Sequence, residues 1–340
     1  MTPPPATGPD NLARARPAAP RALVTGPAAW GKIADAMPGE FDFISWLRGQ
    51  QRRTALVPVP AGDDLAVVRW PVADLLLVGV DQVLDGVHFD SAVHAPRLIG
   101  AKVMNRNLSD CAAMACLPAV AVVAAALPAG RSLEYAKELY LGMQEAGRAF
   151  DCEIVGGDTG TWAGRLAVSV TILGRSAGVE PVTRAGARPG DGIYVTGPLG
   201  GSLHLTGAAE EGLRAGRHMT FTPRVALARD LAARYRVTAM MDLSDGLSRD
   251  LGHICAASKV GAVIDAARVP VHGHAIAHGG DALMRALNDG EDYELVLTSP
   301  DAISEELATR VGEIRAGGGV VLVREGREEA LAPRGWEHSL

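Results

Sequence analysis

The chain has 340 residues and a formal net charge of −6 at pH 7; 48% of its residues are hydrophobic and only 4% are aromatic. This length is sufficient for two mid-sized domains, whose cores must consist mainly of Ala, Val, Leu and Ile. The negative charge disfavours general nucleic-acid binding, which depends on basic surfaces. It leaves phosphate ligands open, because carboxylates that hold divalent cations can bind polyphosphate.

Residues 1–38 are rich in Pro and Ala and lack the continuous apolar core of a signal peptide. We expect a mostly disordered extension there, or in part an upstream start-codon artefact, that carries no chemistry. The most apolar run, 119–127, lies between two prolines, is too short to span a membrane and predicts a buried strand. The four cysteines match neither a zinc-binding spacing nor a disulfide framework, which favours a reduced cytoplasmic setting.

Ordered structure is expected from Gly39, followed by a short amphipathic helix in which Phe43, Trp46 and Leu47 recur at helical spacing. Further along the first half, strands are expected at 65–70, 74–80, 119–127 and 166–173, and helices at 96–114 and 133–150. These mixed elements predict one domain over residues 39–183.

The turn-rich, basic segment from Arg184 to Asp191 separates two patterns of mixed helices and strands, so the domain boundary is placed there. Within 184–340, strands are expected at 193–196, 262–264 and 293–298, and helices after Gly201 and at 224–235 and 247–257. There is no short-period repeat. The pattern as a whole predicts an α+β or α/β protein of two domains.

Aspartates recur where predicted strands or helices end, usually beside Gly, Ser or Thr. They lie in Gly62-Asp63-Asp64, at Asp81, in Asn107-Leu108-Ser109-Asp110, in Gly156-Gly157-Asp158-Thr159 and in Met241-Asp242-Leu243-Ser244-Asp245-Gly246. Any one of these motifs alone is typical of a helix cap or a turn. Partly buried carboxylates that lie close together repel each other, and cations relieve that repulsion. Magnesium takes hard oxygen ligands and shares its coordination sphere with phosphates, so the set predicts metal–phosphate binding.

The glycine-rich run from Gly197 to Gly201 follows a predicted strand, where backbone N–H groups can cradle a phosphate; an ordinary turn is the open alternative. It is neither a Walker loop nor a dinucleotide fingerprint, and the missing Walker lysine favours a kinase that relies on metals. His272, His274 and His278 lie in a glycine-rich stretch and are interpreted as a solvated loop rather than a metal site. His88, which closely follows the Asp81 strand, is the histidine favoured for a site.

Taken in order, these motifs resemble those of thiamine-monophosphate kinases, within a superfamily that includes aminoimidazole ribonucleotide synthetase, selenophosphate synthetase and a hydrogenase-maturation protein. The resemblance runs from about Gly39 to the C-terminus. Besides the aspartate motifs, it is carried by Gly39-Glu40-Phe41, Gly86-Val87-His88-Phe89, Arg184 to Asp191, and Gly290-Glu291-Asp292-Tyr293-Glu294-Leu295.

The resemblance implies an N-terminal α+β domain that binds ATP and magnesium and dimerises through its strands, and a C-terminal α/β domain that completes the active site. Its implied magnesium ligands are Asp63, Asp81, Asp110, Asp158, Asp242 and Asp245, of which Asp110 and Asp245 are also the implied catalytic residues. Its implied ATP contacts are Tyr140, Gly157, Asp158, Arg184 and Ser244. Its implied contacts with the thiamine phosphate are His88, Glu291 and Trp336, although Trp336 could instead cap the core.

The implied cofactors are several Mg²⁺ ions, with K⁺ as a further candidate, and ATP is the co-substrate. The implied partners are thiamine monophosphate and a second copy of the chain, with neither nucleic acid nor membrane. The acceptor is a phosphate monoester whose second pKa is about 6, so it is largely ionised at neutral pH and needs little help from a base. The implied mechanism is therefore direct in-line transfer assisted by metal ions.

The chain departs from the family pattern near these motifs. Two threonines usually precede the aspartate that matches Asp81, whereas this chain has Gly79 and Val80. Asn105-Arg106-Asn107 is atypical before Ser109-Asp110, Cys116 stands where glycine is common, and Asp289-Gly290 replaces a glycine pair. These departures bear on the number of bound ions and on the acceptor rather than on the use of ATP and magnesium.

Two alternatives stay open. One is another ATP-using member of the superfamily with a different acceptor. Against this, a selenophosphate synthetase would have a reactive cysteine near its N-terminus, and no cysteine precedes Cys111 here. The hydrogenase-maturation protein normally ends in a cysteine, and this sequence does not. The other is a non-catalytic paralogue that binds a nucleotide or thiamine phosphate, which the loss of both threonines favours.

Overall fold

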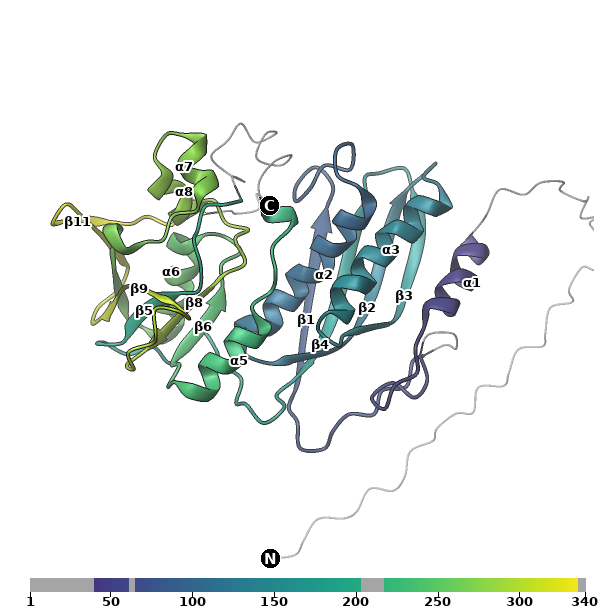
Figure 1. Cartoon of the computed structure of the whole chain (residues 1–340), viewed down its shortest axis with the longest axis horizontal. Helices are drawn as coiled ribbons and strands as arrows, with labels where there is room; N and C mark the ends of the chain where they lie inside the picture. The colour runs from purple at the N-terminus through teal and green to yellow at the C-terminus, as the bar shows by residue number, and fades with distance from the viewer. Residues whose placement is uncertain (1–39, 61–64, 203–216, 336–340) are drawn as a thin grey trace, which may run out of the picture. The chain divides into compact units, whose positions relative to one another are not determined.

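The computed structural model describes residues 40–60, 65–202 and 217–335 (Figure 1). The expected extension over 1–38 lies outside these residues, as does most of the helix expected after Gly201. Within the described residues two sheets are present, which we call the N-terminal and the C-terminal sheet. Each is accompanied by helices, and the expectation of two domains that mix helices and strands is confirmed.

The N-terminal sheet has the strand order β1-β4-β2-β3, with β2 and β3 parallel and the other pairs antiparallel. Its strands are β1 (Leu76–Leu84), β2 (Leu117–Pro128), β3 (Glu153–Trp162) and β4 (Ala167–Arg175). The helices of this half are α1 (Glu40–Gln50), α2 (Pro96–Ala113) and α3 (Leu133–Arg148). Figure 1 shows α2 and α3 side by side across one face of the sheet.

Helices α2 and α3 pack with their backbones in close contact because glycines face each other across the interface. A Cβ atom at Gly100 would collide with the carbonyl oxygen of Leu139, and one at Gly142 would collide with that of Arg97. The N-terminus of α3 is capped by Ser132, whose hydroxyl accepts a hydrogen bond from the backbone of Tyr135. This packing holds α2, which carries several candidate site residues, in a fixed position over the sheet.

The C-terminal sheet has the order β11-β10-β7-β9-β5-β8-β6, in which only β10 and β7 pair in parallel. Its strands are β5 (Gly192–Val195), β6 (Ala239–Asp242), β7 (Gly261–Asp265), β8 (Leu295–Ser299), β9 (Thr309–Arg315), β10 (Val320–Arg324) and β11 (Arg327–Ala330). The accompanying helices are α5 (Val225–Arg234), α6 (Leu247–Ser258), α7 (Gly273–His278) and α8 (Ala282–Asn288). Helix α2 contacts both β6 and α5, so it connects the N-terminal and C-terminal halves of the chain.

Most expected elements are present, and the buried strand over 119–127 is confirmed as part of β2. The strand expected at 65–70 is wrong, because only Val67 pairs there, in a single bridge to Val59. Strand β3 was not expected, since its three glycines disfavour a strand. Gly157 is nevertheless required there, because a Cβ atom at this position would collide with the carbonyl oxygen of Val123 on β2.

The segment with His272, His274 and His278 was expected to be a loop, and this expectation is wrong. It contains the short helix α7, which the side chain of His272 caps. In the part of the chain that the structure describes, no helix combines the length and the apolar character needed to cross a lipid bilayer.

Candidate active site

Three of the aspartates predicted to bind metal line one pocket of about 170 Å³ where the two halves meet. Asp81 lies on β1, Asp110 on the last turn of α2, and Asp242 at the end of β6. Ser244, which was predicted to contact ATP, lines the same pocket, as do Val80, Arg106 and Tyr293. The fold therefore brings together acidic residues from distant parts of the sequence.

Two carboxylates of this pocket, Asp110 and Asp242, have a raised pKa. Partial burial raises the pKa of Asp110 to about 8, and the charges of Asp242 and Asp81 act in the same direction. Burial also raises the pKa of Asp242, although the hydroxyl of Ser109, which donates to its Oδ2 at 2.6 Å, opposes this shift. The charge of Arg184 lowers the pKa of both groups. Such a pocket favours a bound cation.

A guanidinium lies among these carboxylates. Arg106 donates from Nε to Asp81 Oδ2 at 2.6 Å and from Nη2 to Asp81 Oδ1 at 3.3 Å. Its Nη1 lies 3.5 Å from Glu291 Oε1, and its Cζ lies 5.9 Å from the ring centroid of Tyr293. Arg106 was noticed in the sequence only as atypical. A stronger signal was present, because Arg106 and Asp110 are four residues apart and so share a helix face.

The predicted substrate contacts His88 and Glu291 are joined by a buried lysine that the sequence reasoning missed. Lys102 Nζ donates to the carbonyl oxygen of His88 at 2.6 Å and to Glu291 Oε2 at 2.7 Å, and it lies 2.7 Å from His218 Nδ1. Burial lowers the pKa of Lys102 to about 8, against the opposing charge of Glu291. Glu291 is only 5% exposed, and its other oxygen accepts from the hydroxyl of Tyr293 at 3.3 Å.

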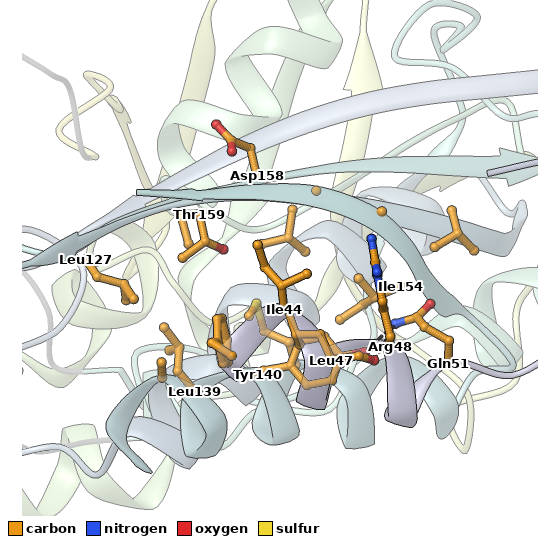
Figure 2. Close-up of a pocket in the computed structure, with 18 of the residues that line it drawn as sticks. Ile44, Leu47, Arg48, Gln51, Leu127, Leu139, Tyr140, Ile154, Asp158 and Thr159 are labelled. Atoms are coloured by element: carbon orange, nitrogen blue, oxygen red, sulfur yellow. Dashed lines mark hydrogen bonds between the residues drawn. The ribbon is translucent and has the colours of Figure 1, made fainter. Parts of the chain in front are cut away.

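The predicted ATP contacts Tyr140 and Gly157 line a second cavity, of about 270 Å³, between α1, α3 and the strands β2 and β3. The hydroxyl of Tyr140 accepts hydrogen bonds from the side-chain amides of Gln51 and Gln144, both at 3.1 Å. Figure 2 shows that the carboxylate of Asp158 points away from this cavity, to the other side of β3. This follows from the alternation of side chains along a strand. Most of the remaining wall is apolar.

Asp245 lies with a different group from the other predicted metal ligands. One ligand atom from each of Asp245, Asp250 and His253 lies within 4.8 Å of the others. Asp250 Oδ2 accepts from the backbone N–H groups of Asp245 and Gly246, at 3.1 and 3.0 Å, and so shapes the turn before α6. Burial raises the pKa of Asp250 well above its usual range. The catalytic role predicted for Asp245 stays a prediction.

The glycine-rich run after β5 is a structural turn. The backbone N–H groups of Gly200 and Gly201 donate to the carboxylate of Asp292 at 2.7 and 3.0 Å, so a group of the protein already takes the donors predicted to cradle a phosphate. The alternative of an ordinary turn is therefore favoured. Two predicted site residues, Asp63 and Trp336, lie outside the described residues.

Comparisons with known proteins agree over most of the chain. Residues 62–176 match the family of the AIR synthase related protein, N-terminal domain, and residues 188–325 match that of its C-terminal domain. A thiamine-monophosphate kinase of Rhodopirellula baltica is 39% identical over 319 residues, which cover 88% of this chain and 97% of the relative.

Solved structures are similar over the same extent. The thiamine-monophosphate kinase from Stenotrophomonas maltophilia matches with a TM-score of 0.73 at 33% identity, covering 85% of this chain and 98% of that one. The structure of AaThiL complexed with AMPPCP and TMP matches with a TM-score of 0.69 at 29% identity, covering 88% of this chain and 97% of that one.

Proposed function

The chain belongs to the thiamine-monophosphate kinases of the AIR synthase related family, and from this premise we propose that it transfers the γ-phosphate of ATP to thiamine monophosphate, which yields thiamine diphosphate. The observation that carries the proposal is the meeting of Asp81, Asp110 and Asp242 in one pocket. The similar structure that holds AMPPCP and TMP supports the same pair of ligands.

Divalent cations fit this pocket on its own chemistry. Burial, followed by repulsion from Asp242 and Asp81, raises the pKa of Asp110, and a bound cation would stabilise its ionised form. Asp110 and Asp242 are the groups that would hold Mg²⁺, which prefers oxygen ligands and leaves places for phosphate oxygens, and Asp81 adds negative charge beside them. When bound, Mg²⁺ supplies charge neutralisation for the phosphates and for the transition state.

The chain's own residues position the phosphates rather than move protons. Because the acceptor phosphate is largely ionised at neutral pH, no side chain needs to act as a base. Ser244 offers a hydroxyl and Arg106 a positive charge at the wall of the pocket. The apolar cavity beside Tyr140 is the place that we propose for the nucleobase, since its size and apolar lining suit a flat heterocycle.

We further propose that the active unit is a homodimer. Strand β1 is an edge strand, and its side chains Leu76, Val78 and Val80 are 52%, 64% and 68% exposed on the face of the sheet away from α2 and α3. An exposed row of apolar side chains on an edge strand favours burial of that surface against another chain. Asp158 lies on the same face as this row. Val80, at the edge of that face, also lines the acidic pocket, so a second copy that covered the face would bring its own Asp158 towards the pocket.

The test is turnover. Full-length protein is incubated with ATP, Mg²⁺ and thiamine monophosphate, and thiamine diphosphate is measured by chromatography. Asp110→Asn is the inactive variant, and Asp151→Asn, a change outside the pocket, is the matched control. Product from the wild type and the control alone supports the proposal.

Absence of product while ATP still binds would overturn the proposed acceptor. It would leave the non-catalytic paralogue, which Gly79 and Val80 favour because neither side chain offers an oxygen to a metal.

A further inference from the structure

Arg106 makes a two-point contact with Asp81 inside the acidic pocket. The two nitrogens lie 2.6 and 3.3 Å from the two carboxylate oxygens, the paired geometry in which a guanidinium binds a carboxylate best. The side chain of Arg106 is 13% exposed and that of Asp81 is 25% exposed, so solvent screens the pair only partly. Both oxygens of Asp81 are therefore already engaged by a permanent positive charge.

The β1 residues just before Asp81 offer the pocket no side-chain oxygen. Gly79 and Val80, which precede Asp81, carry no side-chain oxygen. A Cβ atom at Gly79 would lie 3.9 Å from Asp110 Oδ2, so the side chain at position 79 is the one that would face Asp110. On this side of the pocket, the positive charge that Asp81 and Asp110 meet is that of Arg106, whose charge lowers the pKa of Asp110.

We infer that the guanidinium of Arg106 is a built-in cation that replaces one divalent cation at Asp81, so that the active site holds one ion fewer than the same site without this arginine. The inference rests on the proposed kinase function. It accounts for three features of the sequence together: the arginine at position 106 and the lack of a side-chain oxygen at positions 79 and 80. All three are expected where the β1 side of the site binds no metal ion.

A purely structural role for Arg106 predicts something different. Its Nη1 also reaches Glu291, and its guanidinium lies near the ring of Tyr293, so it helps to connect α2 to the segment before β8. If that were its only role, its removal would lower stability and leave the number of bound ions unchanged. Counting the ions therefore separates the two roles.

The experiment counts Mn²⁺ ions, as probes of the Mg²⁺ sites, bound to full-length protein saturated with AMPPCP, by electron paramagnetic resonance of the free ion. Arg106→Gln is expected to bind one more ion per chain than the wild type, because Asp81 is released. Arg106→Lys keeps a positive charge and is expected to match the wild type. Arg97→Gln, which removes an exposed arginine on the same helix as Arg106 that pairs with Glu138 of α3, is the matched control and is expected to change nothing.

Two further variants guard against poor folding of Arg106→Gln. Asp81→Asn, and Asp81→Asn combined with Arg106→Gln, are both expected to bind as many ions as the wild type, because neither leaves a free carboxylate at position 81. Loss of an ion in Asp81→Asn, or an unchanged count in folded Arg106→Gln, would overturn the inference while the kinase function stands. If the wild type binds no Mn²⁺ with AMPPCP, the metal-assisted function fails as well.

Discussion

The Nζ atom of Lys102 lies 2.7 Å from Oε2 of Glu291, and this buried ion pair connects α2 to the segment that precedes β8. Lys102 is fully buried and Glu291 is 5% exposed. An isolated charge would be costly at either position. The pair therefore holds the two halves of the chain together at the edge of the proposed active site.

Removal of Lys102 alone should destabilise the fold strongly. Lys102→Met would leave Glu291 buried without its closest cation, and we expect a loss of about 3–5 kcal/mol in the free energy of unfolding, measured by urea denaturation. Combining it with Glu291→Gln should recover part of this loss. Lys137→Met, which removes a cation stacked over Trp46, is the control, with an expected loss of about 1 kcal/mol or less. Equal losses in both single variants would contradict the assigned role of the pair.

Magnesium binding should release a proton from Asp110. Its pKa is raised to about 8 in the pocket, so at pH 7 the carboxyl is mostly protonated, whereas a bound metal requires the ionised form. Affinity for Mg²⁺ should therefore rise with pH up to about 8 and then level off. Calorimetry at pH 7 in buffers of different ionisation enthalpy measures the released proton. Asp110→Asn should abolish the release, and an equal release from that variant would assign the proton to another group.

The same shift predicts how stability depends on pH in the absence of metal. Between the ordinary pKa of 3.8 and the raised value of about 8, the folded chain binds a proton at Asp110 that the unfolded chain does not. This contribution to stability is present at low pH and is lost as pH rises through 8. In the presence of a chelator, the free energy of unfolding of the wild type should fall, relative to that of Asp110→Asn, as the pH rises from about 4 to about 8. Because Asp110 is partly exposed to solvent in the pocket, the effect will be smaller than for a fully buried group.

A hydroxyl at position 79 should strengthen metal binding, because it would give the β1 side of the pocket an oxygen ligand that the native Gly79 lacks. There is room for the side chain, because a Cβ atom at Gly79 makes only ordinary contacts, 3.8 Å from Ile172 and 3.9 Å from Asp110. Threonine also suits a strand better than glycine. We expect Gly79→Thr to improve the affinity for Mn²⁺ by about 1 kcal/mol, or about fivefold, as one added polar contact would. Gly79→Val, which has the same shape without the oxygen, is the control, and an equal gain there would show that the hydroxyl is not responsible.

Filling the cavity beside Tyr140 should weaken ATP binding selectively. Ala125 lines this cavity of about 270 Å³, so Ala125→Leu can be accommodated without unfolding. We expect the KM for ATP to rise by at least about tenfold, while the KM for thiamine monophosphate stays the same. Ala73→Leu, a change at an exposed position, is the control. An unchanged KM for ATP would show that the nucleobase does not bind in this cavity.

The parts of the site that could be predicted from sequence are those with a local signal. Most of the aspartates were found from a neighbouring Gly, Ser or Thr, but the expectation that they end elements is wrong for Asp81 and Asp158, which lie within β1 and β3. The helices expected at 96–114, 224–235 and 247–257 agree closely with α2, α5 and α6. Lys102 and His218 gave no such signal, because a charged residue on a helix or in a loop is usually solvated. Here the packing of the C-terminal half against α2 buries both. Likewise, the capture of the N–H groups of Gly200 and Gly201 by Asp292 depends on a contact between segments about ninety residues apart, which no local pattern reveals.

The position of Asp158 leads to a test of the proposed dimer. Asp81 is on the edge strand β1 and Asp158 is on β3 at the opposite edge of the N-terminal sheet, and their side chains lie on opposite faces, as the strand register requires. Within one chain, the two carboxylates therefore cannot share a metal ion. If both serve one active site, Asp158 must come from a second copy.

Mixing two inactive variants decides this. Asp110→Asn and Asp158→Asn are each expected to be inactive as homodimers, but a mixed dimer would contain one site with both native aspartates. After denaturation and refolding together in equal amounts, half of the dimers should be mixed and each should have one working site, which gives about a quarter of wild-type activity. Activity that stays at the level of the separate variants would mean that Asp158 acts within its own chain or not at all. Partial activity in Asp158→Asn alone would instead remove that residue from the metal site.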